Sequence, residues 1–121
     1  MGRLAESAVV NHRCYNSCSA SVLCAFAETA GLSDGEARAL AGPMAGGRMG
    51  KCGALLAAET VLAQKFGEEQ AQALIARLEQ AFMAKNQSIH CAELRGLRLR
   101  TCRGCVQDAA QLLESLLEDE G

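Results

Sequence analysis

The apolar side chains of this chain are mostly small, which restricts the ways in which it can build a core. Hydrophobic residues make up 50% of the 121 residues, whereas aromatic residues contribute only 3%. A core of alanine, leucine, isoleucine and valine is filled well by helices that approach one another closely. We therefore expect an all-α fold of about five helices, in a single domain that spans residues 1–121.

Periodic apolar positions and capping residues place the expected helices along the chain. We expect helices over residues 17–30, 33–41, 53–66, 68–85 and 102–118. Gly31 is expected to end the first helix, and Ser33 with Glu36 has the spacing of a capping box at the start of the second. A glycine-rich loop, residues 42–53, is expected before the third helix, and a short helical turn at residues 91–94.

The charge of the chain and the length of its apolar stretches argue against two classes of partner. The net charge is -2 at pH 7, so the chain lacks the basic field that supplies most nucleic-acid affinity. Its longest apolar stretch is much shorter than the roughly 20 residues needed to span a bilayer, and its first residues lack a signal-peptide core and cleavage site. We therefore expect a cytoplasmic protein with no nucleic-acid partner and no membrane insertion.

Cysteine is the residue type that stands out. The chain has seven of them: Cys14, Cys18, Cys24, Cys52, Cys91, Cys102 and Cys105. Stable structural disulfides are disfavoured in a reducing compartment, so this density indicates metal binding or catalytic thiols instead. The odd number also argues against a closed disulfide framework. The cysteines are therefore the main candidates for chemistry.

Cys52 is the strongest candidate, because it lies where the glycine-rich loop meets the start of an expected helix. The positive end of the helix dipole and the unpaired backbone N–H groups both favour a thiolate at such a position. Arg48 and Lys51 add positive charge, and the glycines allow the backbone to approach an anion or a partner sulfur. The candidate cofactor-binding residues of this loop are Gly47, Arg48, Gly50, Lys51 and Gly53.

Glu59 is an acidic residue within an apolar stripe of the same expected helix. The stripe consists of Leu55, Leu62, Ala63 and Phe66. An acid there either pairs with a buried cation, accepts a proton near Cys52, or belongs to a face that meets a partner. A fourth interpretation is that the helix is rotated and that Glu59 reaches solvent.

Cys102 and Cys105 form a C-x2-C pair, which can chelate a metal or oxidise. Tetrahedral zinc or an iron–sulfur cluster needs further ligands, which Cys14 with Cys18, or Cys52 with Cys91, would have to supply. Because no histidine follows Cys105, the signature of covalent haem attachment is absent and no covalent haem is expected.

The chain resembles the redox-active protein family that is named for its C-GCAxxG-C-C cysteine pattern, and the resemblance covers nearly the whole chain. The sequence YNSCSASV, residues 15–22, is similar to the first family cysteine at the start of a helix. The sequence GGRMGKCGA, residues 46–54, is similar to the glycine-rich loop with the second cysteine. Where the family has a glycine, this chain has Ala57.

The resemblance implies a redox role that rests on four cysteines. They are Cys18, Cys52, Cys91 and Cys102, so that Cys14, Cys24 and Cys105 are additional. It implies no particular reaction, and three hypotheses remain open.

In the first hypothesis, the protein performs thiol–disulfide exchange or electron transfer. Cys52 is then the reacting thiolate and Cys18, Cys91 or Cys102 is the resolving partner. In the second, these four cysteines together bind zinc or an iron–sulfur cluster. In the third, the alanine-rich helices dock to a partner such as another redox protein, a larger oxidoreductase or a membrane transporter.

Overall fold

The computed structural model describes residues 3–13, 17–47, 52–86 and 102–120, and all of its regular elements are helices. They are α1 (Arg3–Arg13), α2 (Cys18–Ala25), α3 (Ala27–Ala30), α4 (Asp34–Ala41), the 3-10 helix η1 (Gly42–Gly47), α5 (Gly53–Lys65), α6 (Glu68–Asn86) and α8 (Cys102–Glu120). The described residues contain no strand, which confirms the all-α prediction. They form seven α-helices rather than about five. The expected turn at residues 91–94 lies outside the described residues.

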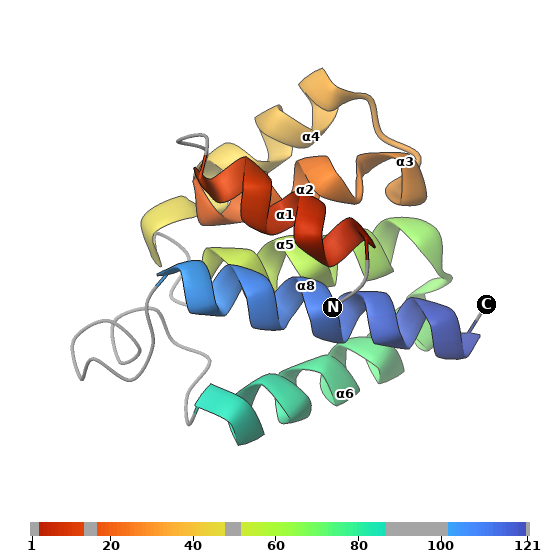
Figure 1. Ribbon diagram of the computed structural model, residues 1–121. Helices are drawn as coiled ribbons and strands as arrows, with labels where there is room; N and C mark the ends of the chain where they lie inside the picture. The colour runs from red at the N-terminus through yellow and green to blue at the C-terminus, as the bar shows by residue number, and fades with distance from the viewer. Residues whose placement is uncertain (1–2, 14–16, 48–51, 87–101, 121) are drawn as a thin grey trace.

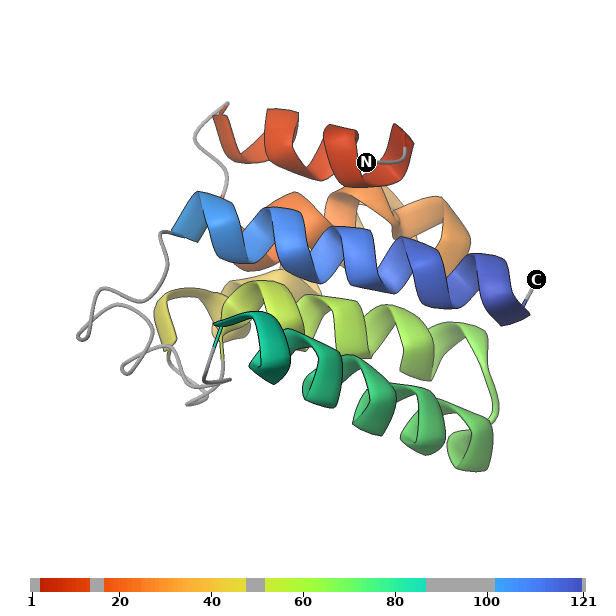
Figure 2. The same cartoon turned by 60° about the horizontal axis from the view of Figure 1, so that its bottom comes forward.

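Helix α5 lies at the centre of the fold, packed against α2, α6 and α8. Helix α1 covers α2 and α8, and α6 lies on the opposite side, against α5 and α8 (Figures 1 and 2). The helices α2, α5 and α8 run in the same direction, so their first turns lie at one end of the bundle. No described helix is both long and apolar enough to cross a membrane.

Two capping predictions are confirmed. Ser33 accepts a hydrogen bond from the Glu36 N–H at 3.1 Å, and the Glu36 carboxylate accepts one from the Ser33 N–H at 3.0 Å, which completes a capping box. Gly31 ends α3 in the left-handed conformation, with a φ of 74°. Glycine adopts this conformation without the steric cost that a Cβ atom brings.

The expected helix over residues 17–30 is divided, and this corrects the prediction. Phe26 has φ −104° and ψ 12°, outside the α-helical region, and separates α2 from α3. Its N–H still donates to the Val22 carbonyl at 3.1 Å, so the backbone remains hydrogen-bonded through the bend. The Phe26 side chain is fully buried. The helix is therefore interrupted at the residue that carries the largest apolar side chain of this segment into the core.

The first half of the glycine-rich loop is also more ordered than expected, because residues 42–47 form η1. Pro43 suits the first turn of a helix, where its missing N–H would have no partner in any case. The hydroxyl of Thr60 on α5 lies 4.0 Å from the Met44 sulfur. Ser19 of α2 donates to the Ala41 carbonyl at 2.8 Å. These contacts hold the chain that leads toward Cys52 between α2 and α5.

Helix α1 was not predicted. Ala5, Ala8 and Val9 have helical spacing and are buried against the rest of the bundle. The backbone N–H groups of Leu4 and Ala5 donate to the two carboxylate oxygens of Glu114, at 3.1 and 3.3 Å. A carboxylate at this position satisfies donors that the helix itself leaves unpaired and complements the positive end of its dipole.

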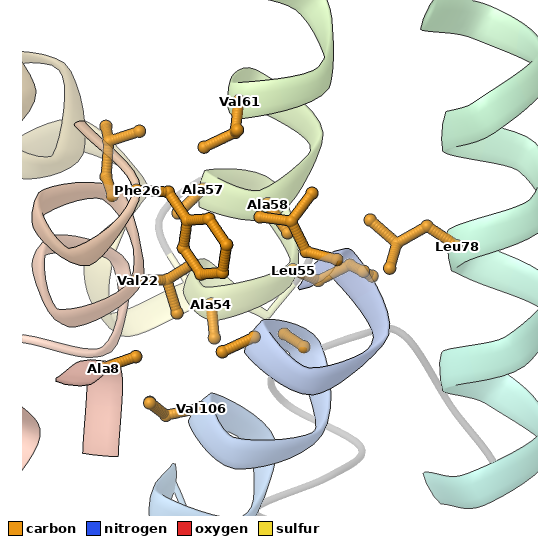
Figure 3. Packing of buried hydrophobic residues seen from close by; sticks show 14 of the residues in the cluster. Ala8, Val22, Phe26, Ala54, Leu55, Ala57, Ala58, Val61, Leu78 and Val106 are labelled. Atoms are coloured by element: carbon orange, nitrogen blue, oxygen red, sulfur yellow. The ribbon is translucent and has the colours of Figure 1, made fainter. Parts of the chain in front are cut away.

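Figure 3 shows how small side chains fill the centre of the core. The Phe26 ring packs beside the alanine side chains of α5, among them Ala57 and Ala58, all of them fully buried. Leu78 of α6 faces α5 from the other side (Figure 3). Alanines on α5 allow α2 and α5 to approach closely, as the composition predicts.

Candidate functional site

The first turns of three helices bring cysteines to one end of the bundle. Cys18 is the first residue of α2, Cys52 is the N-cap of α5, and α8 begins with Cys102 and continues to Cys105 one turn later. Because α2, α5 and α8 are parallel (Figures 1 and 2), the positive ends of their dipoles point to the same end. This arrangement favours negative charge on sulfur at that end.

Cys52 and Cys105 form a buried thiol pair. Their exposed fractions are 5% and 4%, and both belong to the main apolar cluster, which joins α5 and α8. The Cys105 thiol donates a hydrogen bond to the Cys52 sulfur. Neither cysteine is part of a disulfide in this structure. The structure therefore places two reduced thiols in contact with each other.

The surroundings of Cys52 stabilise its thiolate. The hydrogen bond from Cys105 is the largest effect and lowers the pKa of Cys52 to about 7, although burial acts in the opposite direction. The backbone N–H groups of Leu55 and Ala54 lower it further. Neither N–H meets the full geometry of a capping hydrogen bond to the sulfur, so we regard them as dipoles near the thiolate rather than as a cap. The lowered pKa increases the fraction of Cys52 that is ionised at neutral pH.

Cys24 on α2 shows the opposite behaviour. It is half-buried and lies beside Asp34 and Arg38 of α4, which form an ion pair at 3.0 Å. Burial raises the pKa of Cys24, and the Asp34 carboxylate, to which the thiol donates, raises it further, while Arg38 acts against both. Cys24 is therefore held as a protonated thiol, and it provides an internal control for the reactivity of Cys52.

Comparison with known protein families supports the interpretation of the cysteines. The family described as "Putative redox-active protein (C_GCAxxG_C_C)" matches residues 16–116. The chain belongs to this family. The match begins after α1 and includes both members of the buried thiol pair. The comparison with curated proteins gives no match. The comparison with solved structures also gives none.

Membership of the C_GCAxxG_C_C family confirms the resemblance and supports a redox role in general. The structure shows only part of the four-cysteine set. Cys52 is buried at the start of α5, and Cys18 is half-buried and packs against the same apolar cluster. Cys91 lies outside the described residues, as does the side chain of Cys102. The roles of these two cysteines stay predictions.

The loop residues expected to bind a cofactor are only partly described. Gly47 ends η1, and Gly53 begins α5, where it is buried. Arg48, Gly50 and Lys51 lie outside the described residues. Within the described part of the chain, no group of three or more His, Cys, Asp or Glu residues is arranged to hold a metal ion. The zinc or iron–sulfur site also requires Cys91 and the side chain of Cys102, which lie outside the described residues, and it stays a prediction.

Glu59 is half-buried and makes a polar interaction. The stripe in which it was expected is only partly buried: Leu55 and Leu62 are enclosed, but Ala63 is exposed and Phe66 is half-buried. Helix α5 is thus rotated about its axis relative to the predicted orientation, and its buried face differs from the predicted stripe. Glu59 is also seven residues beyond Cys52, which corresponds to about 10 Å along a helix. Its role as a proton acceptor stays a prediction.

Cys105 is the residue that sequence reasoning did not select. It lies in the apolar stripe of α8, next to Val106 and four residues before Ala109, which are both fully buried. This spacing indicates that Cys105 faces the core. It does not indicate that α8 places Cys105 against Cys52, because that contact depends on how two helices pack across about 50 residues of sequence.

Proposed function

We propose that this protein carries out reversible dithiol–disulfide chemistry in which Cys52 is the attacking thiolate and Cys105 is the resolving thiol. The observation that carries the proposal is the buried hydrogen bond from Cys105 to the Cys52 sulfur at the start of α5. A redox role is in line with the family to which the chain belongs. The resolving partner differs from those that the sequence predicted.

The two thiols suit the two steps of disulfide formation, as when the reagent oxidised dithiothreitol is the substrate. The Cys52 thiolate attacks one sulfur of the substrate, the substrate S–S bond breaks, and one substrate thiolate leaves. Cys105 then attacks the Cys52 sulfur, so the mixed disulfide breaks and the second substrate thiolate leaves, while Cys105 gives up its proton. The substrate gains two electrons and the protein gains one disulfide. The reverse sequence reduces the protein again.

The contact between the thiols favours this order. Cys105 donates toward the Cys52 sulfur, so a negative charge on Cys52 is stabilised by the Cys105 thiol. When an oxidant converts Cys52 to a mixed disulfide, that negative charge disappears, and the resolving sulfur is already in place. The second step is therefore intramolecular.

Redox titration of single-cysteine variants tests the proposal. The protein is equilibrated in buffers with increasing ratios of oxidised to reduced dithiothreitol, and the remaining thiols are counted by alkylation and intact mass. We expect the wild type to lose two thiols in one transition, and the Cys52→Ser and Cys105→Ser variants to lose that transition.

The Cys24→Ser variant is the matched control, because Cys24 is a thiol held protonated on another helix. It should retain the transition of the wild type. A transition that survives in Cys105→Ser but disappears in Cys102→Ser would contradict the assignment of Cys105.

A further inference from the structure

The burial of the thiol pair restricts the oxidants that it can use. Cys52 and Cys105 expose only 5% and 4% of their surfaces, and both belong to the apolar cluster that also includes Ala54, Leu55 and Val106. Figure 3 places Ala54 of α5 and Val106 of α8 in the same region of the core. Both cysteine side chains are thus almost fully buried within the apolar cluster.

Disulfide exchange makes a large spatial demand on such a site. The attacking sulfur must approach along the S–S axis of the substrate, so the leaving thiol and the group attached to it also need room. A protein disulfide brings two segments of backbone with it, and a charged disulfide must lose its hydration in apolar surroundings. A small uncharged oxidant needs less room and loses less hydration.

From the enclosure of the pair we infer that its oxidant is a small hydroperoxide rather than a protein disulfide. The inference rests on the proposed dithiol–disulfide function and names its oxidising substrate. The reacting part of a hydroperoxide is two oxygen atoms. When hydrogen peroxide is the oxidant, both of its oxygen atoms end as water. It is a small two-electron oxidant that converts a thiolate and a thiol to a disulfide.

The atoms and electrons balance in two steps. The Cys52 thiolate attacks the terminal oxygen of the hydroperoxide, the O–O bond breaks, and the alkoxide or hydroxide leaves with a proton from solvent, which gives Cys52 sulfenic acid. The Cys105 sulfur then attacks the Cys52 sulfur, the S–O bond breaks, and hydroxide leaves with the Cys105 proton as water. The hydroperoxide is reduced by two electrons and one disulfide forms.

The test compares two uncharged oxidants, hydrogen peroxide and hydroxyethyl disulfide, on the native protein and on the protein unfolded in urea. The loss of the Cys52 thiol is followed by mass spectrometry of the tryptic peptide 52–65, which contains no other cysteine. Both reagents react with the same thiolate, so the effect of folding on the pKa of Cys52 cancels in the ratio of their two reaction rates. We expect folding to slow the disulfide relative to the peroxide by about tenfold or more.

The Cys105→Ser variant provides a second readout. Treated with hydrogen peroxide, it should accumulate Cys52 sulfenic acid that dimedone traps, whereas the wild type should form the disulfide. If folding slows both reagents equally while the disulfide between Cys52 and Cys105 still forms, the inference about the oxidant is wrong and the proposed function stands. If neither reagent produces that disulfide, both are wrong.

Discussion

Replacing Cys105 with alanine should raise the pKa of Cys52 and remove most of its thiolate at pH 7. The hydrogen bond from Cys105 is the largest of the effects that lower this pKa, and without it the cost of burying a charge is opposed mainly by two backbone N–H groups. The ultraviolet absorbance of the thiolate, measured from pH 5 to pH 10, reports the change directly. Subtracting the titration of Cys52→Ser removes the signal of the thiols outside the pair.

Two further variants make this titration decisive. Cys105→Ser keeps an O–H donor at the same position and should leave the pKa of Cys52 much closer to that of the wild type. Cys24→Ala removes a thiol that is not part of the pair and should leave the titration midpoint unchanged. If the alanine and serine variants at position 105 titrate alike, the hydrogen bond is not the cause of the low pKa.

The same shift couples stability to pH. A thiol whose pKa is lower in the folded than in the unfolded chain stabilises the fold in its ionised form. This stabilisation is fully present above the ordinary thiol pKa of 9.0 and is lost as the pH falls through about 7. Its size is on the order of 2 kcal/mol. The free energy of unfolding should therefore rise between pH 7 and pH 9 in the wild type, and much less in Cys105→Ala.

Replacing Phe26 with alanine should destabilise the protein by about 3–5 kcal/mol. Phe26 is fully buried at the bend between α2 and α3, and its ring packs beside the alanine side chains of α5 (Figure 3). These alanines cannot fill the space that the ring leaves, because they have no further rotatable side-chain atoms. Urea denaturation at constant pH measures the loss.

Phe66 is the matched control for this variant. It is also a phenylalanine, but it is only half-buried at the C-cap of α5, where its ring lies 5.9 Å from the Lys65 ammonium group. Phe66→Ala should cost about 1 kcal/mol. Equal losses for the two variants would contradict the view that the Phe26 ring holds α2 and α5 together.

The fold class could be predicted because it follows from local properties of the sequence. Small apolar side chains at helical spacing indicate packed helices, and Gly31, Ser33 and Glu36 mark helix ends through their own backbone and side-chain chemistry. Helix α1 was harder to predict, since its first N–H groups are satisfied by Glu114, more than 100 residues away in the sequence. The break at Phe26 likewise depends on where its ring fits in the finished core.

The candidate site could be predicted only in part, for a similar reason. The position of Cys52 at a helix start is visible in the sequence, and so is its tendency to form a thiolate. The choice of Cys105 as its partner depends on the rotation of α8 against α5. The C-x2-C spacing offers Cys102 and Cys105 equally, and no local property of the sequence distinguishes them.

The disulfide map of the oxidised protein tests the central claim most directly. Trypsin cleaves after Lys51, Lys65, Arg100 and Arg103, so Cys52, Cys102 and Cys105 appear in separate peptides, 52–65, 101–103 and 104–121. The protein is oxidised under native conditions, alkylated, digested without reduction and analysed by mass spectrometry. A link between peptides 52–65 and 104–121 is the result we predict. A link from peptide 52–65 to peptide 101–103, or to a peptide that contains Cys18 or Cys91, would contradict the assignment of Cys52 and Cys105 as the redox pair.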